Sequence, residues 1–201
     1  MRKFLSILLL ASSLGLMCNA QQFSYGYKAG ASFSGMNLKE GSTKTGFNGG
    51  IFGQLRIASF AIQPEMLYGM QGMKYKYDLV TEGDAIISDY SGKVSMAYLS
   101  IPLMLKYYVV SGLSIEAGPQ LGFLLSAKDK PDDWEKRDVK DIMKKTDFAI
   151  NFGASYKLPL APVGFYARYS LGLTDIYNTS KSGSDDAGKN RVFQIGAFVI
   201  F

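Results

Sequence analysis

Charged side chains lie on the polar side of segments that otherwise alternate apolar residues with small polar ones. They include Lys28, Arg56, Glu65, Lys106, Glu116, Lys157 and Arg168. In strands, these side chains should point into the space that the polar side encloses. Charges in a low-dielectric interior must pair or be hydrated. The pattern therefore indicates one of two chemistries: a cation-lined path for small anions, or a set of ion pairs that fills the space.

The chain has few of the residues that usually take part in catalysis or metal binding. The chain has no histidine and a single cysteine, Cys18, which removes the commonest general base, the commonest metal ligand and every Ser-His arrangement. No spacing of serine with lysine, or of two carboxylates, suggests a nucleophile. We therefore expect no enzyme activity and no catalytic, cofactor or metal site. The net charge of +5 is too small to argue for a nucleic-acid partner.

The elements that carry these charges are expected to be strands, because the residues alternate with period two between Gly-rich or Asp-rich breaks. Eight such segments follow one another. They span residues 23–34, 47–57, 60–74, 94–108, 113–126, 146–158, 164–174 and 191–201. Each is close to the roughly 9–11 residues that a tilted membrane strand needs.

The connections between these segments alternate strictly between long and short. The long ones are 35–45, 75–93, 127–145 and 175–190, and the short ones are 58–59, 109–112 and 159–163. Outer-membrane barrels have short periplasmic turns and long extracellular loops. The sequence therefore predicts an all-β fold, an eight-stranded antiparallel transmembrane β-barrel with up-and-down meander topology, in which both ends of the chain are periplasmic.

A soluble lipocalin-like barrel is the alternative, with its apolar side turned inward. Glycines on the polar side, and Phe and Tyr near the ends of the apolar runs, favour the arrangement in which the apolar side faces lipid. The interior of an eight-stranded barrel is just wide enough for side chains. Ion pairs that fill the lumen are therefore favoured over a narrow anion-favouring channel, although the channel remains an alternative.

The first 20 residues have the pattern of a secretory signal peptide. Arg2 and Lys3 precede a short apolar stretch at 4–16, and Ala20 is the small residue before the expected cleavage site. We expect a signal peptide at 1–20 and one barrel domain at 21–201. A lipoprotein anchor at Cys18 is the less favoured alternative, because Met17 is not the small residue that such a site has.

Four stretches resemble the PorT-like outer-membrane β-barrel family. They read YLSIPLMLKY at 98–107, EAGPQLG at 116–122, ARYSLGLTDI at 167–176 and QIGAFVIF at 194–201. The resemblance covers most of the mature chain and implies the outer-membrane barrel fold. It implies little about the task, because these motifs are mostly structural. Ser100 departs from the acidic residue that the family often has there.

The chain's function is expected to lie in its loops. We expect an outer-membrane structural or interaction protein that contacts an extracellular or envelope protein, is surrounded by outer-membrane lipid and is a monomer. Loop candidates for contact are Trp134, Tyr75, Tyr77 and Tyr90. Residues 132–145 are expected to be a solvated charged loop with a helical turn, and a short docking helix is the alternative. The alternating run Phe193, Ile195, Val199 and Phe201 resembles the C-terminal signal read by the barrel assembly machinery.

Overall fold

A computed structural model describes residues 21–36, 41–81, 85–131, 137–175 and 189–201. Within these residues the chain forms nine strands and one 3-10 turn. They are β1 (Gln21–Met36), β2 (Gly41–Ile57), β3 (Phe60–Thr81), β4 (Ala85–Val110), β5 (Leu113–Pro131), β6 (Arg137–Asp138), η2 (Lys140–Ile142), β7 (Thr146–Lys157), β8 (Val163–Asp175) and β9 (Lys189–Ile200). No helix in the described part of the chain is long and apolar enough to cross a membrane.

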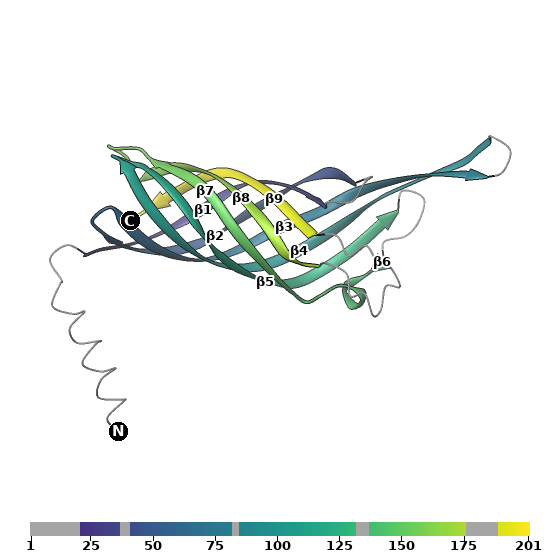
Figure 1. Ribbon diagram of the computed structural model, residues 1–201, viewed down its shortest axis with the longest axis horizontal. Helices are drawn as coiled ribbons and strands as arrows, with labels where there is room; N and C mark the ends of the chain where they lie inside the picture. The colour runs from purple at the N-terminus through teal and green to yellow at the C-terminus, as the bar shows by residue number, and fades with distance from the viewer. Residues whose placement is uncertain (1–20, 37–40, 82–84, 132–136, 176–188) are drawn as a thin grey trace, which may run out of the picture.

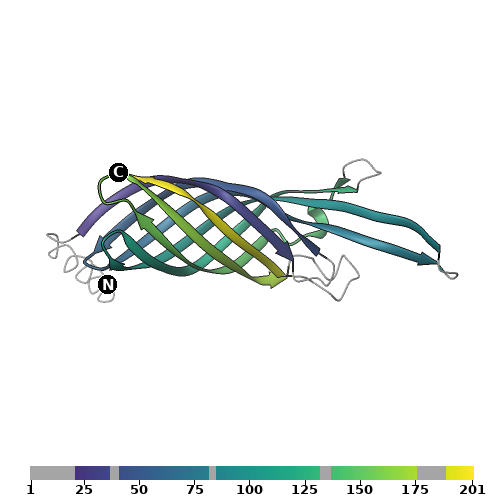
Figure 2. The ribbon, with the colours of Figure 1, turned by 90° about the horizontal axis from the view of Figure 1, so that it is seen from above.

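Eight of the strands form a closed ring (Figures 1 and 2). The order is β1-β2-β3-β4-β5-β7-β8-β9, every neighbouring pair is antiparallel, and β9 pairs with β1 to close the ring. The ninth strand, β6, has two residues and pairs only with the outer part of β5. The ring satisfies the backbone hydrogen bonds without a free sheet edge, as a membrane requires. The eight-stranded antiparallel meander is confirmed.

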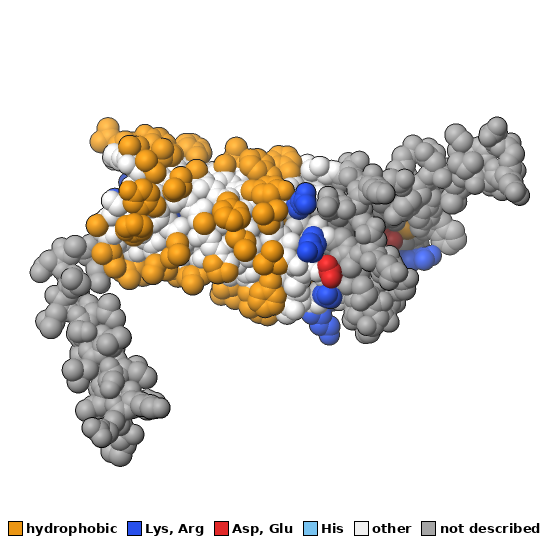
Figure 3. Space-filling view, in the orientation of Figure 1, with side chains coloured by type: hydrophobic (Ala, Val, Ile, Leu, Met, Phe, Trp, Pro, Cys, Tyr) orange, Lys and Arg blue, Asp and Glu red, His pale blue; other side chains and the backbone are white. Residues whose placement is uncertain are grey.

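The barrel is apolar outside and polar inside. Phe23, Leu105 and Ile195 on the outer side are 71%, 59% and 50% exposed, whereas Glu65 and Arg168 on the inner side are 3% and 1% exposed. Hydrophobic side chains form a broad band around the barrel body in Figure 3, and charged ones gather beyond it. A soluble lipocalin-like barrel would show the opposite distribution. The apolar outer surface fits lipid as the surrounding medium.

The two ends of the barrel differ in their connections. At the short-turn end, Ala58 and Gly112 adopt positive φ angles of 54° and 83° in tight turns, and a third turn joins β7 to β8. A Cβ at Gly112 would lie 2.3 Å from the Lys157 carbonyl oxygen, so glycine is required there. The opposite, long-connection end carries the β1–β2, β3–β4, β5–β7 and β8–β9 connections.

The expected loop at 75–93 is a paired hairpin. β3 and β4 remain paired out to Thr81 and Ala85, with Tyr75 opposite Gly92, Tyr77 opposite Tyr90 and a register shift between Leu79 and Val80. This ribbon extends far beyond the barrel body (Figure 1). The prediction of a loop is wrong, because β3 and β4 continue to pair beyond the barrel body, where no lipid selects for apolar alternation.

At 132–145, the part of the segment that the structure describes contains one helical turn, η2, and not the longer docking helix of the alternative. Residues 132–136 lie outside the described residues, and residues 137–142 form β6 and η2. The backbone here pairs with β5 instead of with itself, since Asp138 lies opposite Lys128 and the Val139 amide donates to the Ala127 carbonyl at 3.1 Å. Met143 and Val139 pack against a cluster on the inner side of β4 and β5 that includes Met96, Tyr98 and Leu124.

Candidate functional site

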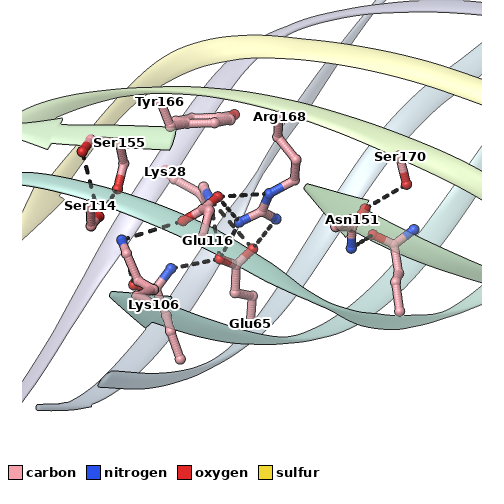
Figure 4. A network of polar contacts seen from close by, with 12 residues as sticks. Lys28, Glu65, Lys106, Ser114, Glu116, Asn151, Ser155, Tyr166, Arg168 and Ser170 are labelled. Carbon is pink, nitrogen blue, oxygen red and sulfur yellow. Dashed lines mark hydrogen bonds and ion pairs between the residues drawn. The ribbon is translucent and has the colours of Figure 1, made fainter. Parts of the chain in front are cut away.

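The centre of the lumen is a buried charge cluster in which Arg168 joins two carboxylates from other strands (Figure 4). Arg168 projects inward from β8 and forms a two-pronged contact with Glu65 of β3, at 2.7 Å from Nη1 and 2.8 Å from Nη2. Its Nε and Nη2 also donate to Oε1 of Glu116 on β5, at 3.0 Å and 2.8 Å. The planar guanidinium fork fits such paired recognition, which a lysine cannot reproduce.

Two lysines complete the charge cluster. Lys28 of β1 lies 3.2 Å from Glu65 Oε1, and Lys106 of β4 lies 3.4 Å from Glu116 Oε2. Gln63 accepts from Lys106 at 3.3 Å and donates to Glu65 at 2.6 Å. Lys106 and Glu116 are register partners on neighbouring strands. The pairing across the β4–β5 hairpin that this spacing suggests is therefore present.

The charge cluster contains Lys28, Lys106 and Arg168 against Glu65 and Glu116, which leaves one positive charge in excess. Aromatic rings contact both lysines of the charge cluster. The Lys28 ammonium lies 4.1 Å from the Tyr166 ring centre, and the Lys106 ammonium lies 5.7 Å from the Phe198 ring centre. Cation–π contacts of this kind stabilise a desolvated cation. Both carboxylates are engaged by cations, so neither is available as a general base.

Arg56 does not join the charge cluster, contrary to expectation. Its guanidinium stacks on the Tyr108 ring at 3.9 Å, and its Nε donates to the Ala58 carbonyl at 2.9 Å. Arg56 lies one residue from the end of β2, at the short-turn end. Its place in the alternation correctly gives the inward side, but its height along the barrel is too far from Glu65.

An aromatic cluster lies beside the charge cluster on its short-turn side. It consists of Phe52, Tyr166 and Phe198, with Ile200 packed against it. The Phe52 and Phe198 rings meet edge to face at 6.1 Å. The Tyr166 side chain lies directly over Gly30 and Gly196. A Cβ at Gly30 would lie 2.8 Å from the Tyr166 hydroxyl, and a Cβ at Gly196 would lie 2.8 Å from a Tyr166 ring carbon. Glycine on the lumen side thus makes room for a ring in a narrow interior.

Neutral polar pairs fill the lumen on the other side of the charge cluster. Asn151 donates to Gln120 at 3.2 Å and accepts from Ser170 at 2.6 Å, and the Tyr166 hydroxyl donates to Asn48 at 2.5 Å. Further along, Asn190 pairs with Gln71, and Thr174 donates to Asp147 at 2.5 Å. Sequence reasoning did not assign these pairs. The inward amides were visible in the alternation, but nothing in it shows which residues meet across the lumen.

The four candidate contact residues of the loops are placed only in part. Trp134 lies outside the described residues. Tyr75, Tyr77 and Tyr90 lie in the strands of the β3–β4 hairpin. They therefore belong to a projecting two-stranded ribbon, not to an irregular loop.

The residues of the expected assembly signal lie along β9 and just beyond it. Phe193, Ile195 and Phe201 are exposed on the outer side, and Val199 is half-buried. Phe193 contacts the ring of Phe33 at 6.4 Å, and Phe201 that of Tyr25 at 5.8 Å. These contacts join β9 to β1, where the ring closes.

The arrangement in the lumen is suited to locking strands together. Arg168, Glu65 and Glu116 tie β8, β3 and β5 across the interior, and hydrogen bonds extend the network on both sides. Within the described residues, no group of three His, Cys, Asp or Glu side chains is placed to hold a metal ion.

Comparison with known proteins gives a family match and similar folds. A family model described as "Outer membrane protein beta-barrel domain" matches residues 19–178. A search of curated proteins found no match. The chain is similar to Neisserial surface protein A, at 14% identity and a TM-score of 0.50, covering 90% of this chain and 99% of that one. It is also similar to Ail, the attachment invasion locus protein of Yersinia pestis, solved with the heparin analogue sucrose octasulfate, at 14% identity, a TM-score of 0.47 and the same two coverages.

Proposed function

We propose that this chain, which belongs to the outer membrane protein beta-barrel domain family, is an interaction protein that meets its partner at the long-connection end of the barrel. The barrel is integral to the bacterial outer membrane, as the family and the apolar outer surface show. In this account the barrel is an anchor. The partner is an extracellular or envelope protein, because short turns are periplasmic and long connections extracellular in barrels of this kind.

The β3–β4 hairpin is the observation that carries this proposal. Pairing of β2 with β3 ends at Gly41 and Tyr75, and pairing of β4 with β5 ends at Gly92 and Pro131. Beyond these residues the hairpin continues as a two-stranded ribbon. An isolated hairpin is marginally stable in water. The edges of such a ribbon offer backbone donors and acceptors to an extended segment of another chain.

The filled lumen supports an anchor over a narrow channel. Arg168 reaches from β8 to a carboxylate on β3, so ion pairs cross the interior of the barrel (Figure 4). The excess positive charge is the one feature that favours an anion channel. An ion that passed through would have to separate the carboxylates from their cations, which is costly in a desolvated interior.

Biogenesis follows the expectations drawn from the sequence. We infer that residues 1–20 are a signal peptide removed on export, that the outward run Phe193, Ile195, Val199 and Phe201 is read by the barrel assembly machinery, and that the folded chain is a monomer. We also assign the chain to the PorT-like branch of outer-membrane barrels on the four stretches that resemble it. The protein is proposed to be non-catalytic, since both carboxylates of the charge cluster are engaged by cations.

Photo-crosslinking in living cells tests the interaction. A photoreactive phenylalanine analogue at Tyr77 or Tyr90 in the hairpin should give adducts with one protein, because these positions lie beyond the barrel. Tyr68 is the matched control, since it belongs to the same strand but lies on the lipid-facing side of the barrel body. The same analogue at Trp134 provides a second test of the long-connection end. Equal protein adducts from Tyr68, or none from any site at the long-connection end, would contradict the proposal.

A further inference from the structure

The lumen opens at the short-turn end into a cavity of about 300 Å³ that the charge cluster does not reach. We call it the mouth cavity. It is lined by Gln22, Ser24, Gln54, Arg56, Tyr108, Ser111, Gly112, Lys157, Pro159, Ile200 and Phe201. These residues come from β1, β2, β4, β7, β9 and the adjoining turns, so several strands of the closed ring build the mouth cavity together.

Two cations line the mouth cavity without an acidic side chain beside them. The lining contains Arg56 and Lys157, but neither aspartate nor glutamate. Neither cation forms an ion pair with any carboxylate of the described chain. The Arg56 Nε donates a hydrogen bond to the Ala58 carbonyl, and stacking on the Tyr108 ring holds the guanidinium in place. The guanidinium is therefore oriented by the protein while its two terminal amino groups make no contact with a carboxylate.

Neutral hydrogen-bonding groups surround the two cations. The Tyr108 hydroxyl donates to Gln54 at 3.0 Å, which fixes the amide against the ring that carries Arg56. Ser24 and Ser111 add hydroxyl groups to the lining. A guanidinium, an ammonium and several neutral donors around one small space is the combination that recognises an oxyanion.

The inner side of the mouth cavity is apolar and its surroundings are positive. Ile200 lines the cavity and packs against the aromatic cluster of Phe52, Tyr166 and Phe198. That cluster contacts Lys28 and Lys106 of the charge cluster, which has one positive charge in excess. The excess positive charge of the charge cluster thus adds to the field of Arg56 and Lys157.

We propose that the mouth cavity binds a phosphate group. The two cations match a phosphate group, which carries one negative charge as a diester and nearly two as a monoester at neutral pH. The group has two possible sources, because the short-turn end lies where the lumen meets both the periplasm and the inner leaflet. It is either a free phosphate compound or the headgroup of a phospholipid.

Nuclear magnetic resonance tests this on isotope-labelled protein extracted in a nonionic detergent without phosphate. Inorganic phosphate is titrated against chloride at equal ionic strength, and phosphatidylglycerol against the matched diacylglycerol. Saturable shifts of the Arg56 side-chain and Gly112 amide signals are expected in at least one arm, and the arm that responds identifies the source. If neither inorganic phosphate nor phosphatidylglycerol causes saturable shifts in the wild-type protein, the proposal is overturned without any need for variants.

Substitutions locate the site. Arg56→Gln or Lys157→Gln should each weaken the apparent affinity by about tenfold or more, because each removes a charge-assisted hydrogen bond. Lys128→Gln is the matched control, since Lys128 is exposed near the far end of β5. Folding of each variant is checked by its heat-dependent migration in detergent gels. A double variant carries both Arg56→Gln and Lys157→Gln. If it folds and still binds phosphate with wild-type affinity, the assignment of the site is overturned.

Discussion

Arg168 is the residue on which the order of the lumen depends, because it contacts two carboxylates that lie on different strands. Its side chain is 1% exposed, and Glu65 and Glu116 are nearly as deeply buried. A buried ion pair is weak support for stability in itself, since desolvation offsets much of the attraction. Removing one partner is different, because it leaves the other charges buried without compensation.

The Arg168→Leu variant should therefore lose about 3–5 kcal/mol of the free energy of unfolding. Urea unfolding of the protein in lipid vesicles measures this difference. Lys157→Gln is the matched control, because Lys157 is inward but half-exposed and forms no ion pair within the described chain, and it should change the free energy by less than about 1 kcal/mol. Equal effects of the two substitutions would show that the charge cluster does not tie the strands together.

At the residue scale, alternation in the sequence identifies which side chains point inward but not which of them meet. Lys106 and Glu116 could be paired in advance, because a short turn fixes their register. The contact of Arg168 with Glu65 joins residues 103 positions apart and depends on the stagger of the closed ring, which no local pattern reveals. The same stagger explains why Arg56 does not join the charge cluster: its side chain points inward as predicted, but it lies at a different height along the barrel axis from Glu65.

At the element scale, glycines on the lumen side allow strands to carry large rings. A Cβ at Gly196 would lie 2.2 Å from the Ala29 carbonyl oxygen and 2.8 Å from the Tyr166 ring. Gly53 offers a contrast on the outer side, where a Cβ would approach Phe23 only to 3.9 Å. The two positions are both strand glycines, but only one is required by packing.

Gly196→Ala should lower the free energy of unfolding by about 1–3 kcal/mol, because the added methyl group overpacks the lumen. Gly53→Ala should be neutral or slightly stabilising, since alanine reduces the freedom of the unfolded chain and meets no close neighbour. Urea unfolding of the two variants in the same vesicles compares them. A larger loss for Gly53→Ala would contradict this explanation of the lumen glycines.

The β3–β4 hairpin is the element that the sequence predicted least well. Its inner parts were placed correctly, because apolar alternation marks the lipid-facing side. Beyond Lys74 no lipid selects for that alternation, so charged and aromatic residues resembled a loop while backbone pairing continued. The segment at 137–143 shows the same limit, since its contacts with β5 and with Met96 lie outside any local signal.

Excision of the ribbon tests whether the hairpin is separate from the anchor. Residues 76–91 are replaced by a two-residue Asn-Gly turn between Tyr75 and Gly92, which are register partners. The shortened protein should keep its heat-dependent migration and stay within about 1 kcal/mol of wild-type stability, because the removed residues lie beyond the last register pairs of β3 with β2 and of β4 with β5. Failure of the barrel to assemble would show that the hairpin belongs to the folding unit.

At the scale of the whole molecule, the polar interior and apolar exterior follow from one requirement, that lipid surrounds the chain. The fold class, the strand order and the alternation of connection lengths could be predicted from the sequence, because each is set by local periodicity or by turn length. The occupied lumen could be argued only from the small size of the barrel. The ion pairs that cross it, and the mouth cavity below them, arise from ring closure.

Conductance in planar lipid bilayers tests the central claim most directly, that the barrel is a filled anchor and not a channel. Arg168, Glu65 and Glu116 span the interior, so the wild-type protein should insert without a steady current at high salt and moderate voltage. A porin inserted in the same membrane serves as the positive control. A steady open-channel current from the wild-type protein, proportional to voltage and favouring anions, would contradict the account.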